Sequence, residues 1–363
     1  GLQDGSTDEK PLSENGFGEQ LDIFSAAANE KNVSAHSGYQ NIENTDHFYQ
    51  SVETELARKM LLGKLLQQSS VCFDTETTSL KTLEAKLVGI AFSYSKGKGY
   101  YLPIPEKENE AFAILEEFRP FFDHEGIEKI GQNLKYDIKV LQNYDIQVKG
   151  PMFDTMIAHY LINPDMRHNM EVLSETYLNY TPVPIEKLIG KKGKNQGSMR
   201  NVPLPEQTEY AVEDADITWQ LKQIFEKELE ANGLTRLFKD IEIPLVHVLA
   251  AMEMEGIKLD EAFLHSLSAD LSKDIDRLEK KIYEEADTDF NLASPKQLGV
   301  VLFEKMKLIE KPKKTRTGQY ATGEEVLSKL AEDHPIVKNI LEWRGLVKLK
   351  NTYVEALPNE VSP

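Results

Sequence analysis

The chain has 363 residues, of which 40% are hydrophobic and 28% charged, so it is long enough for about two domains and apolar enough to give each a core. Its single cysteine, Cys72, excludes an internal disulfide, and no N-terminal apolar run indicates a signal peptide or membrane span, so we expect a cytoplasmic protein without a membrane partner. The net charge of −18 argues against a generally basic, nucleic-acid-binding surface, although a metal site must itself be rich in carboxylates and local basic segments can still bind phosphates.

The first 68 residues change character once. Residues 1–44 are rich in Gly, Ser, Asn, Asp and Glu and show no sustained hydrophobic period, which predicts a disordered linker. Between residues 45 and 68 the apolar side chains recur mostly three or four positions apart, which predicts an amphipathic helix that leads into the first strand.

The next strand carries the most informative residues. Residues 71–73 are typical of a short buried strand, and it runs directly into Asp74 and Glu76. Residues i and i+2 of a strand share a face, so both carboxylates leave the sheet on the same side. Two close anions are costly unless a cation lies between them, which favours a divalent metal site. On these two residues alone, a polar strand end that turns into a Thr/Ser loop is the alternative.

The following segments predict a mixed sheet covered by helices. Strands are expected at 86–94, 99–104, 129–131 and near 153, and helices at 109–123, 133–144 and up to 162. A strand meander followed by strand–helix alternation is typical of an α/β fold. Asp137 lies where a strand gives way to a helix, a position at which open α/β sheets place ligand groups. It would face the first pair, or else be an ordinary first-turn acid favoured by the helix dipole.

A long helix is predicted to begin at a pair of prolines near residue 203 and to end at about residue 231. Tyr210 and Asp214 are four residues apart and therefore share one face of this helix. Asp216 points elsewhere, and we expect it to be a structural or solvated acid.

Two basic loops and further helices complete the pattern. Residues 187–200 form a Gly-punctuated basic loop that either lies along a phosphate backbone or is simply solvated. Amphipathic runs at 260–286 and 334–357 predict two long helices. The loop between them carries a basic run, residues 311–318, that contains no acid and suits a phosphate backbone: Lys311, Lys313, Lys314 and Arg316.

Taken together, three motifs carry a family resemblance: Asp74-x-Glu76, Asn133-x-x-Tyr136-Asp137 and Tyr210-x-x-x-Asp214. In this order they resemble the DEDDy 3′→5′ exonucleases, whose fold is ribonuclease-H-like. The stretches Phe-Asp-Thr-Glu-Thr, Gly-Gln-Asn-Leu-Lys-Tyr-Asp and Tyr-Ala-Val-Glu-Asp-Ala-Asp are similar to the proofreading domain of the bacterial DNA polymerase I family, family A. Farther along, residues 243–260 resemble the start of the polymerase module, and 290–298 and 341–350 resemble its thumb.

The resemblance implies a domain order. After the linker it places an α/β, ribonuclease-H-like exonuclease domain with a mixed sheet at residues 45–235. A mostly α-helical thumb subdomain, the N-terminal part of the polymerase domain, would occupy residues 236–363. The palm and fingers, which carry the polymerase carboxylates in this family, would follow residue 363, so we expect no polymerisation from this fragment.

The resemblance also implies a two-metal mechanism. Two divalent ions about 3.5–4 Å apart neutralise the phosphate, activate water and stabilise the leaving oxygen, and Mg²⁺ or Mn²⁺ suits an all-carboxylate site. Asp74 would bridge the ions, Glu76 and Asp214 would bind the one that activates water, and Asp137 would bind the second. Tyr210, whose unperturbed phenol pKa is about 10, would orient the water rather than act as a base.

Several residues are expected at the substrate end by the same resemblance. Leu80 would pack on the terminal base, although it could also be a core residue, and Arg167 would contact a phosphate. The last nucleotides would be held or splayed by Gln132, Asn133 and Tyr136. Met199 stands where the family often has a large aromatic side chain, so we expect weaker base stacking there.

The expected partner is DNA, with a single-stranded or frayed 3′ end in the exonuclease site and duplex at the thumb of a monomeric replication and repair enzyme. Two other functions stay open. A ribonuclease D-like 3′→5′ exoribonuclease shares the three motifs, but residues 241–357 resemble a thumb and argue against it. A catalytically silent DNA-binding scaffold is disfavoured because all four acids and Tyr210 are present.

Overall fold

The computed structural model describes residues 38–361, which form two compact units that meet along the chain between Gly256 and Ile257. Most of the predicted linker lies outside the described residues. Its end, residues 38–44, is ordered: the backbone of Gln40 exchanges hydrogen bonds of 3.0 and 2.9 Å with residues 179 and 181. The first unit also includes residues 236–256, which the sequence-based division assigned to the thumb.

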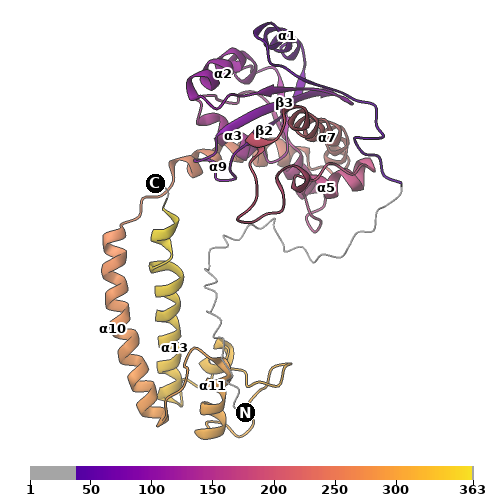
Figure 1. The fold of residues 1–363 in the computed structure, drawn as a ribbon. Coiled ribbons are helices and arrows are strands. Elements are labelled where there is room, and N and C mark those ends of the chain that lie inside the picture. Colours follow the sequence, from indigo (N-terminus) through magenta and orange to yellow (C-terminus); the bar gives the residue numbers. More distant parts are fainter. Residues whose placement is uncertain (1–37, 362–363) are drawn as a thin grey trace, which may run out of the picture. The chain divides into compact units, whose positions relative to one another are not determined.

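The first unit is built on a mixed sheet covered by helices, as predicted (Figure 1). Its six strands lie in the order β1-β4-β3-β2-β5-β6. Strands β2, β3 and β4 are antiparallel neighbours, whereas β1 pairs with β4, β5 with β2 and β6 with β5 in parallel. Their bounds are β1 Phe48–Ser51, β2 Ser70–Thr77, β3 Leu87–Ser95, β4 Lys98–Pro103, β5 Glu128–Gly131 and β6 Met152–Asp154. Strand β2 therefore lies inside the sheet, flanked by β3 and β5.

Helices cover both faces of this sheet. On one face Phe92 of β3 stacks on Phe118 of α2, with ring centroids 5.8 Å apart. On the other face α7 crosses the strands so closely that a Cβ added to Gly99 of β4 would lie 2.3 Å from a methyl group of Val212. The longer helices of this unit are α1 Glu55–Leu65, α2 Glu108–Phe122, α3 Leu134–Gln142, α4 Thr155–Ile162, α7 Leu204–Ala231 and α9 Ile243–Glu255. Short ones are α5 Met170–Leu173, η1 Ser174–Leu178, α6 Glu186–Ile189, η2 Met199–Asn201, α8 Thr235–Leu237 and η3 Phe238–Glu242.

The single helix predicted for residues 45–68 is wrong in its first half. Residues 48–51 form β1, because the edge of β4 offers them a parallel partner. Thr54 then begins α1 as its N-cap, and its hydroxyl accepts the N–H of Ala57 at 3.2 Å. A long-range strand pairing has overridden a local helical period.

The second unit is helical, as predicted. Helices α10 (Glu261–Ala286) and α13 (Pro335–Lys348) lie antiparallel, since Asn339 near the start of α13 bonds Glu285 near the end of α10 at 3.0 Å. The smaller elements are α11 Pro295–Val300, η4 Val301–Lys305, α12 Glu324–Ser328, η5 Leu349–Val354 and η6 Leu357–Glu360. Its core gathers apolar side chains from α10, α11, η4 and α13.

Among the helices that the structure describes, none is long and apolar enough to cross a lipid bilayer.

Candidate active site

The carboxylates of β2 meet those of α7 on one face of the sheet. Phe73 of β2 packs on Phe122 of α2, and because side chains alternate along a strand, Asp74 and Glu76 face the side covered by α7. One oxygen each of Asp74, Glu76 and Asp214 lie within 4.8 Å of one another. Acids separated by more than 130 positions in the chain are thus brought into one cluster.

Burial and mutual repulsion govern the protonation of this cluster. Burial raises the pKa of Asp74 to about 7. Burial, together with the charges of neighbouring carboxylates, raises the pKa values of Glu76 and Asp214 well above their usual range. Hard divalent cations prefer oxygen ligands, and such an ion would relieve the repulsion between these oxygens. The donor set therefore fits Mg²⁺ or Mn²⁺.

Tyr210 lies one turn before Asp214 on α7, and its hydroxyl donates a hydrogen bond to the Asp214 carboxylate. Burial and the charges of Asp214, Glu76 and Asp74 raise the pKa of Tyr210 further above its usual value. The phenol is therefore neutral at physiological pH and can donate a hydrogen bond but cannot act as a base.

Asp137 is held by the backbone between the two acids of β2. Strand β5 pairs with β2 only as far as Cys72, so the N–H of Thr75 on that edge lacks a strand partner. Asp137 Oδ1 accepts this N–H at 3.0 Å and the Thr75 hydroxyl at 2.5 Å. Its pKa is raised well above the usual range by burial and by the charge of Asp74. The structure thus places Asp137 beside Asp74, although it is not one of the three clustered carboxylates.

Two positioning residues were missed by the sequence interpretation, Thr75 and Asp154. The carboxylate of Asp154 caps α4 by accepting the N–H groups of Met156 and Ile157 at 2.9 and 3.2 Å. It also accepts those of Asn133 and Leu134, at 3.2 and 2.7 Å. The Asp-Thr pair at the end of β6 is a recognisable N-cap signal, but its second set of bonds is long-range.

The predicted substrate residues surround the start of α3. Asn133 is exposed and has a left-handed backbone with φ 64°, and Nε2 of Gln132 donates to the carbonyl of His168 at 2.7 Å. The hydroxyl of Tyr136 donates to the carbonyl of Ser79 at 2.7 Å, which fixes the loop leading to Leu80.

Two predicted contacts project from the surface, and one does not. Leu80 is 83% exposed, so its reading as a core residue is wrong, and Arg167 is exposed. Met199 is only 2% exposed and packs with Val88 and Val202 against Tyr210. Met199 is thus a buried packing residue next to Tyr210 and does not lie at the surface.

The basic loop before α7 divides into two parts. Its lysines are exposed, whereas Arg200 donates hydrogen bonds of 2.5 Å to the carbonyl oxygens of Ile104 and Leu87. Gln207 holds the same turn by donating to the carbonyl oxygens of Met199 and Val202. Arg200 is therefore structural rather than a phosphate ligand.

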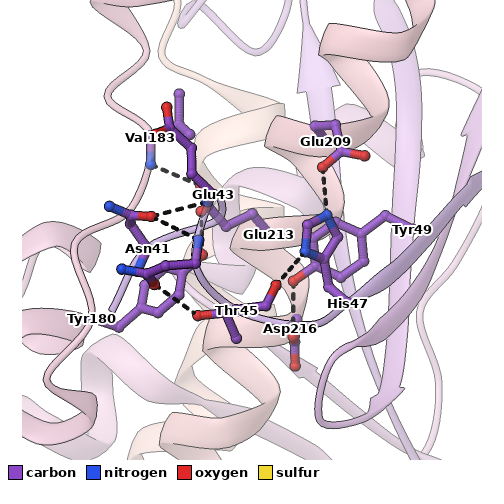
Figure 2. A network of polar contacts seen from close by, with 11 residues as sticks. Asn41, Glu43, Thr45, His47, Tyr49, Tyr180, Val183, Glu209, Glu213 and Asp216 are labelled. Atoms are coloured by element: carbon purple, nitrogen blue, oxygen red, sulfur yellow. Dashed lines mark hydrogen bonds and ion pairs between the residues drawn. The ribbon is translucent and has the colours of Figure 1, made fainter. Parts of the chain in front are cut away.

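Other acids of α7, Glu213 and Asp216, take part in a separate network of polar contacts (Figure 2). Glu213 accepts the hydroxyl of Tyr180 at 2.6 Å and the N–H of Val183 at 2.8 Å. Asp216 accepts the hydroxyl of Tyr49 and the N–H of Gly97, both at 2.9 Å. Of the two roles expected for Asp216, structural or solvated, its burial and hydrogen bonds identify the structural one.

In the second unit the four predicted basic residues, Lys311, Lys313, Lys314 and Arg316, are all exposed. A short hairpin carries the last three: Lys314 and Tyr320 form an antiparallel bridge, and Ala321 donates to the carbonyl of Lys313 at 2.9 Å. Lys314 also lies over the Tyr320 ring, 4.9 Å from its centroid.

Comparison with known proteins finds a matching family for each of the two units. A family model described as 3′-5′ exonuclease matches residues 49–230, and one described as DNA polymerase family A matches residues 261–363. DNA polymerase I of Pseudomonas aeruginosa is 38% identical over 314 residues, which cover 83% of this chain and 34% of that protein. DNA polymerase I of Borreliella burgdorferi is 36% identical over 344 residues, which cover 93% of this chain and 37% of that protein. The chain thus spans about a third of the length of these curated relatives.

The fold is similar to a solved structure described as the POL domain of Pol1 from M. smegmatis in complex with DNA primer-template and dNTP. The TM-score is 0.70 at 24% identity, and the match covers 86% of this chain and 50% of the other. With the exonuclease match over half of the sequence and the polymerase match over the helical unit, the chain belongs to the DNA polymerase I family, family A, and carries its 3′-5′ exonuclease domain.

Proposed function

We propose that the first unit hydrolyses DNA from its 3′ end by a two-metal mechanism, as the proofreading nuclease of a DNA polymerase I. The observation that carries this proposal is the cluster of Asp74, Glu76 and Asp214, whose oxygens lie within 4.8 Å of one another. Tyr210 is hydrogen-bonded to Asp214, and Asp137 is close enough to Asp74 to feel its charge. Phosphodiester hydrolysis requires such charge compensation at the phosphate.

The residues have separate tasks in this mechanism. Asp74, Glu76 and Asp214, with Asp137, would hold two Mg²⁺ or Mn²⁺ ions, which supply an activated water and stabilise the leaving 3′ oxygen. Asp137 keeps Oδ1 on Thr75 and can offer Oδ2, so its orientation is set before any ligand binds. Tyr210 stays neutral: its one O–H donates to Asp214, and its oxygen can accept a hydrogen bond from the attacking water, which would orient that water together with Glu76.

The substrate we propose is a single-stranded or frayed DNA end. The exposed Leu80 offers an apolar surface to the terminal base, and Gln132, Asn133, Tyr136 and Arg167 surround the sugar–phosphate chain. The exposed lysines and arginine of residues 311–316 suit the backbone of a duplex held by the second unit. We propose that the protein acts as a monomer in the cytoplasm, the compartment of bacterial DNA.

The test is digestion of 5′-labelled oligonucleotides with matched DNA and RNA sequences, with Mg²⁺, Mn²⁺ or a chelator. We expect stepwise shortening of the DNA strand from its 3′ end, loss of activity with the chelator, and loss in Asp74→Ala. Digestion of RNA but not DNA would replace this proposal by a ribonuclease D-like function. Activity that survives in an Asp74→Ala, Glu76→Ala variant would come from a contaminant and would support a silent scaffold.

A further inference from the structure

Two histidines outside the carboxylate site tie the loop after α4 to the body of the first unit. His159 lies on α4 and is fully buried, and His168 at the end of the loop is 7% exposed. Their Nδ1 atoms lie 2.6 Å apart, and Nε2 of His159 lies 3.1 Å from the hydroxyl oxygen of Tyr177 on η1. The ring of His159 also packs on Phe225 of α7, with centroids 5.4 Å apart.

The two Nδ1 atoms can form a hydrogen bond only if one of them, and not both, carries a proton, so that one Nδ1 donates and the other accepts. If Nδ1 of His159 donates, its Nε2 accepts the hydroxyl proton of Tyr177, and in the other tautomer both directions reverse. Two fully protonated rings would place two N–H groups against each other. Burial and the neighbouring His168 ring lower the pKa of His159 to about 4, so the pair keeps its single shared proton at neutral pH.

The hydrogen-bond chain continues from His168 to the start of α3. The carbonyl oxygen of His168 accepts Nε2 of Gln132 at 2.7 Å, and Oε1 of Gln132 accepts the hydroxyl of Thr155. Gln132 precedes Asn133, and Arg167 precedes His168 in the chain. The histidine pair is therefore linked to two residues proposed above to hold the substrate strand, to Gln132 by a hydrogen bond and to Arg167 through the chain.

We propose that His159 and His168 are positioning residues for the substrate strand. Their hydrogen bond fixes the 163–168 loop, and the loop in turn sets Gln132 and Arg167 against the nucleotides upstream of the scissile bond. This inference rests on the proposed 3′-exonuclease function. Loosening the loop weakens the binding of a polynucleotide but leaves the chemistry at the carboxylates unchanged.

The experiment compares two substrates with Mg²⁺. One is a single-stranded oligodeoxynucleotide, and the other is the p-nitrophenyl ester of thymidine 5′-monophosphate, which offers a phosphodiester but no upstream nucleotides. His159→Phe keeps the ring and removes both hydrogen bonds. We expect it to raise KM for the oligonucleotide by about five- to ten-fold, with kcat within about two-fold and ester hydrolysis unchanged.

Two further variants separate positioning from general damage. His159→Asn places an amide where Nδ1 stood and should recover part of the lost KM. Tyr160→Phe is the matched control, because Tyr160 is 48% exposed and packs edge-on against His168 at 5.5 Å through its ring. It should behave as the wild type. Thermal melting of each variant shows that the unit is folded.

Unchanged KM and kcat for the oligonucleotide in folded His159→Phe would overturn the proposal. A fall of kcat on both substrates would also overturn it, since the pair would then support the carboxylate site or the fold as a whole. Should His159→Phe not fold, His168→Asn tests the same KM prediction, because it keeps the backbone carbonyl that Gln132 uses. A wild type that fails to shorten DNA would refute the proposed function itself, before any variant is compared.

Discussion

Helix α7 carries acids on two faces, and the two sets differ in their hydrogen bonds and in their neighbours. Glu213 and Asp216 are buried, and each receives a tyrosine O–H, from Tyr180 and Tyr49 respectively (Figure 2). Each also receives a backbone N–H. Asp214 faces Asp74 and Glu76 instead and, among the described residues 38–361, receives a hydrogen bond only from the hydroxyl of Tyr210. Buried acids that accept hydrogen bonds from the protein stabilise the fold. Clustered acids that accept few hydrogen bonds repel one another, and a bound cation would remove this repulsion.

The largest expected effect is a difference in activity between variants on the two faces of α7. Asp214→Asn removes a proposed metal ligand and should lower kcat for DNA hydrolysis on the order of a thousand-fold, because metal ions contribute several kcal/mol at the transition state. Asp216→Asn, two residues away, should keep most of the activity of the folded protein. Single-turnover digestion with Mg²⁺ measures both. Equal losses in the two variants would abolish the distinction between the faces.

Tyr210→Phe should have a smaller effect on the same reaction. The variant keeps the ring packed against Met199 but removes the hydroxyl that donates to Asp214 and orients water. We expect kcat to fall by about ten- to a hundred-fold with little change in KM, which is the range of one positioned hydrogen bond at a transition state. A rate that rises with pH as a phenol ionises would contradict the role as a neutral donor.

The hydrogen-bonded acids of α7 should matter for stability rather than for activity. Glu213→Leu leaves the hydroxyl of Tyr180 and the N–H of Val183 without their acceptor, at a cost of about 1–3 kcal/mol for each unsatisfied group. The melting temperature should fall by several degrees, measured by circular dichroism. Glu209→Gln is the control: its ion pair with His47 is partly exposed, and such pairs contribute about 0–1 kcal/mol.

The smallest effect has the opposite sign. In the absence of divalent ions, Asp74→Asn should raise the melting temperature by a few degrees at pH 8, because one anion leaves the cluster. In the wild type the folded state holds the Asp74 proton up to a pKa of about 7, above the 3.8 of the free group. The contribution of Asp74 to the stability of the metal-free protein is therefore greatest below about pH 4, where the group is protonated in both states. It falls as the pH rises towards 7. Mg²⁺ should restore the wild type but not the variant. A melting temperature that does not change with Asp74→Asn would show that the repulsion is absent.

The sequence determined much of the site through short-range rules. Alternation along β2 placed Asp74 and Glu76 on one face, and helical spacing did the same for Tyr210 and Asp214, because these periods depend only on local backbone geometry. The order of the three motifs then indicated the family. Residue types in fixed local patterns carry this information without any knowledge of the fold.

Only the tertiary structure decided which segments meet. The pairing that turned residues 48–51 into a strand, the bond from Thr75 to Asp137 and the burial of Met199 all depend on partners far away in the chain. His159 and His168 lie only nine residues apart, but their contact also depends on the fold, because it follows from the path of the loop between them. A hydrogen-bond donor is satisfied by whatever acceptor the folded chain brings to it, and no local period records that choice.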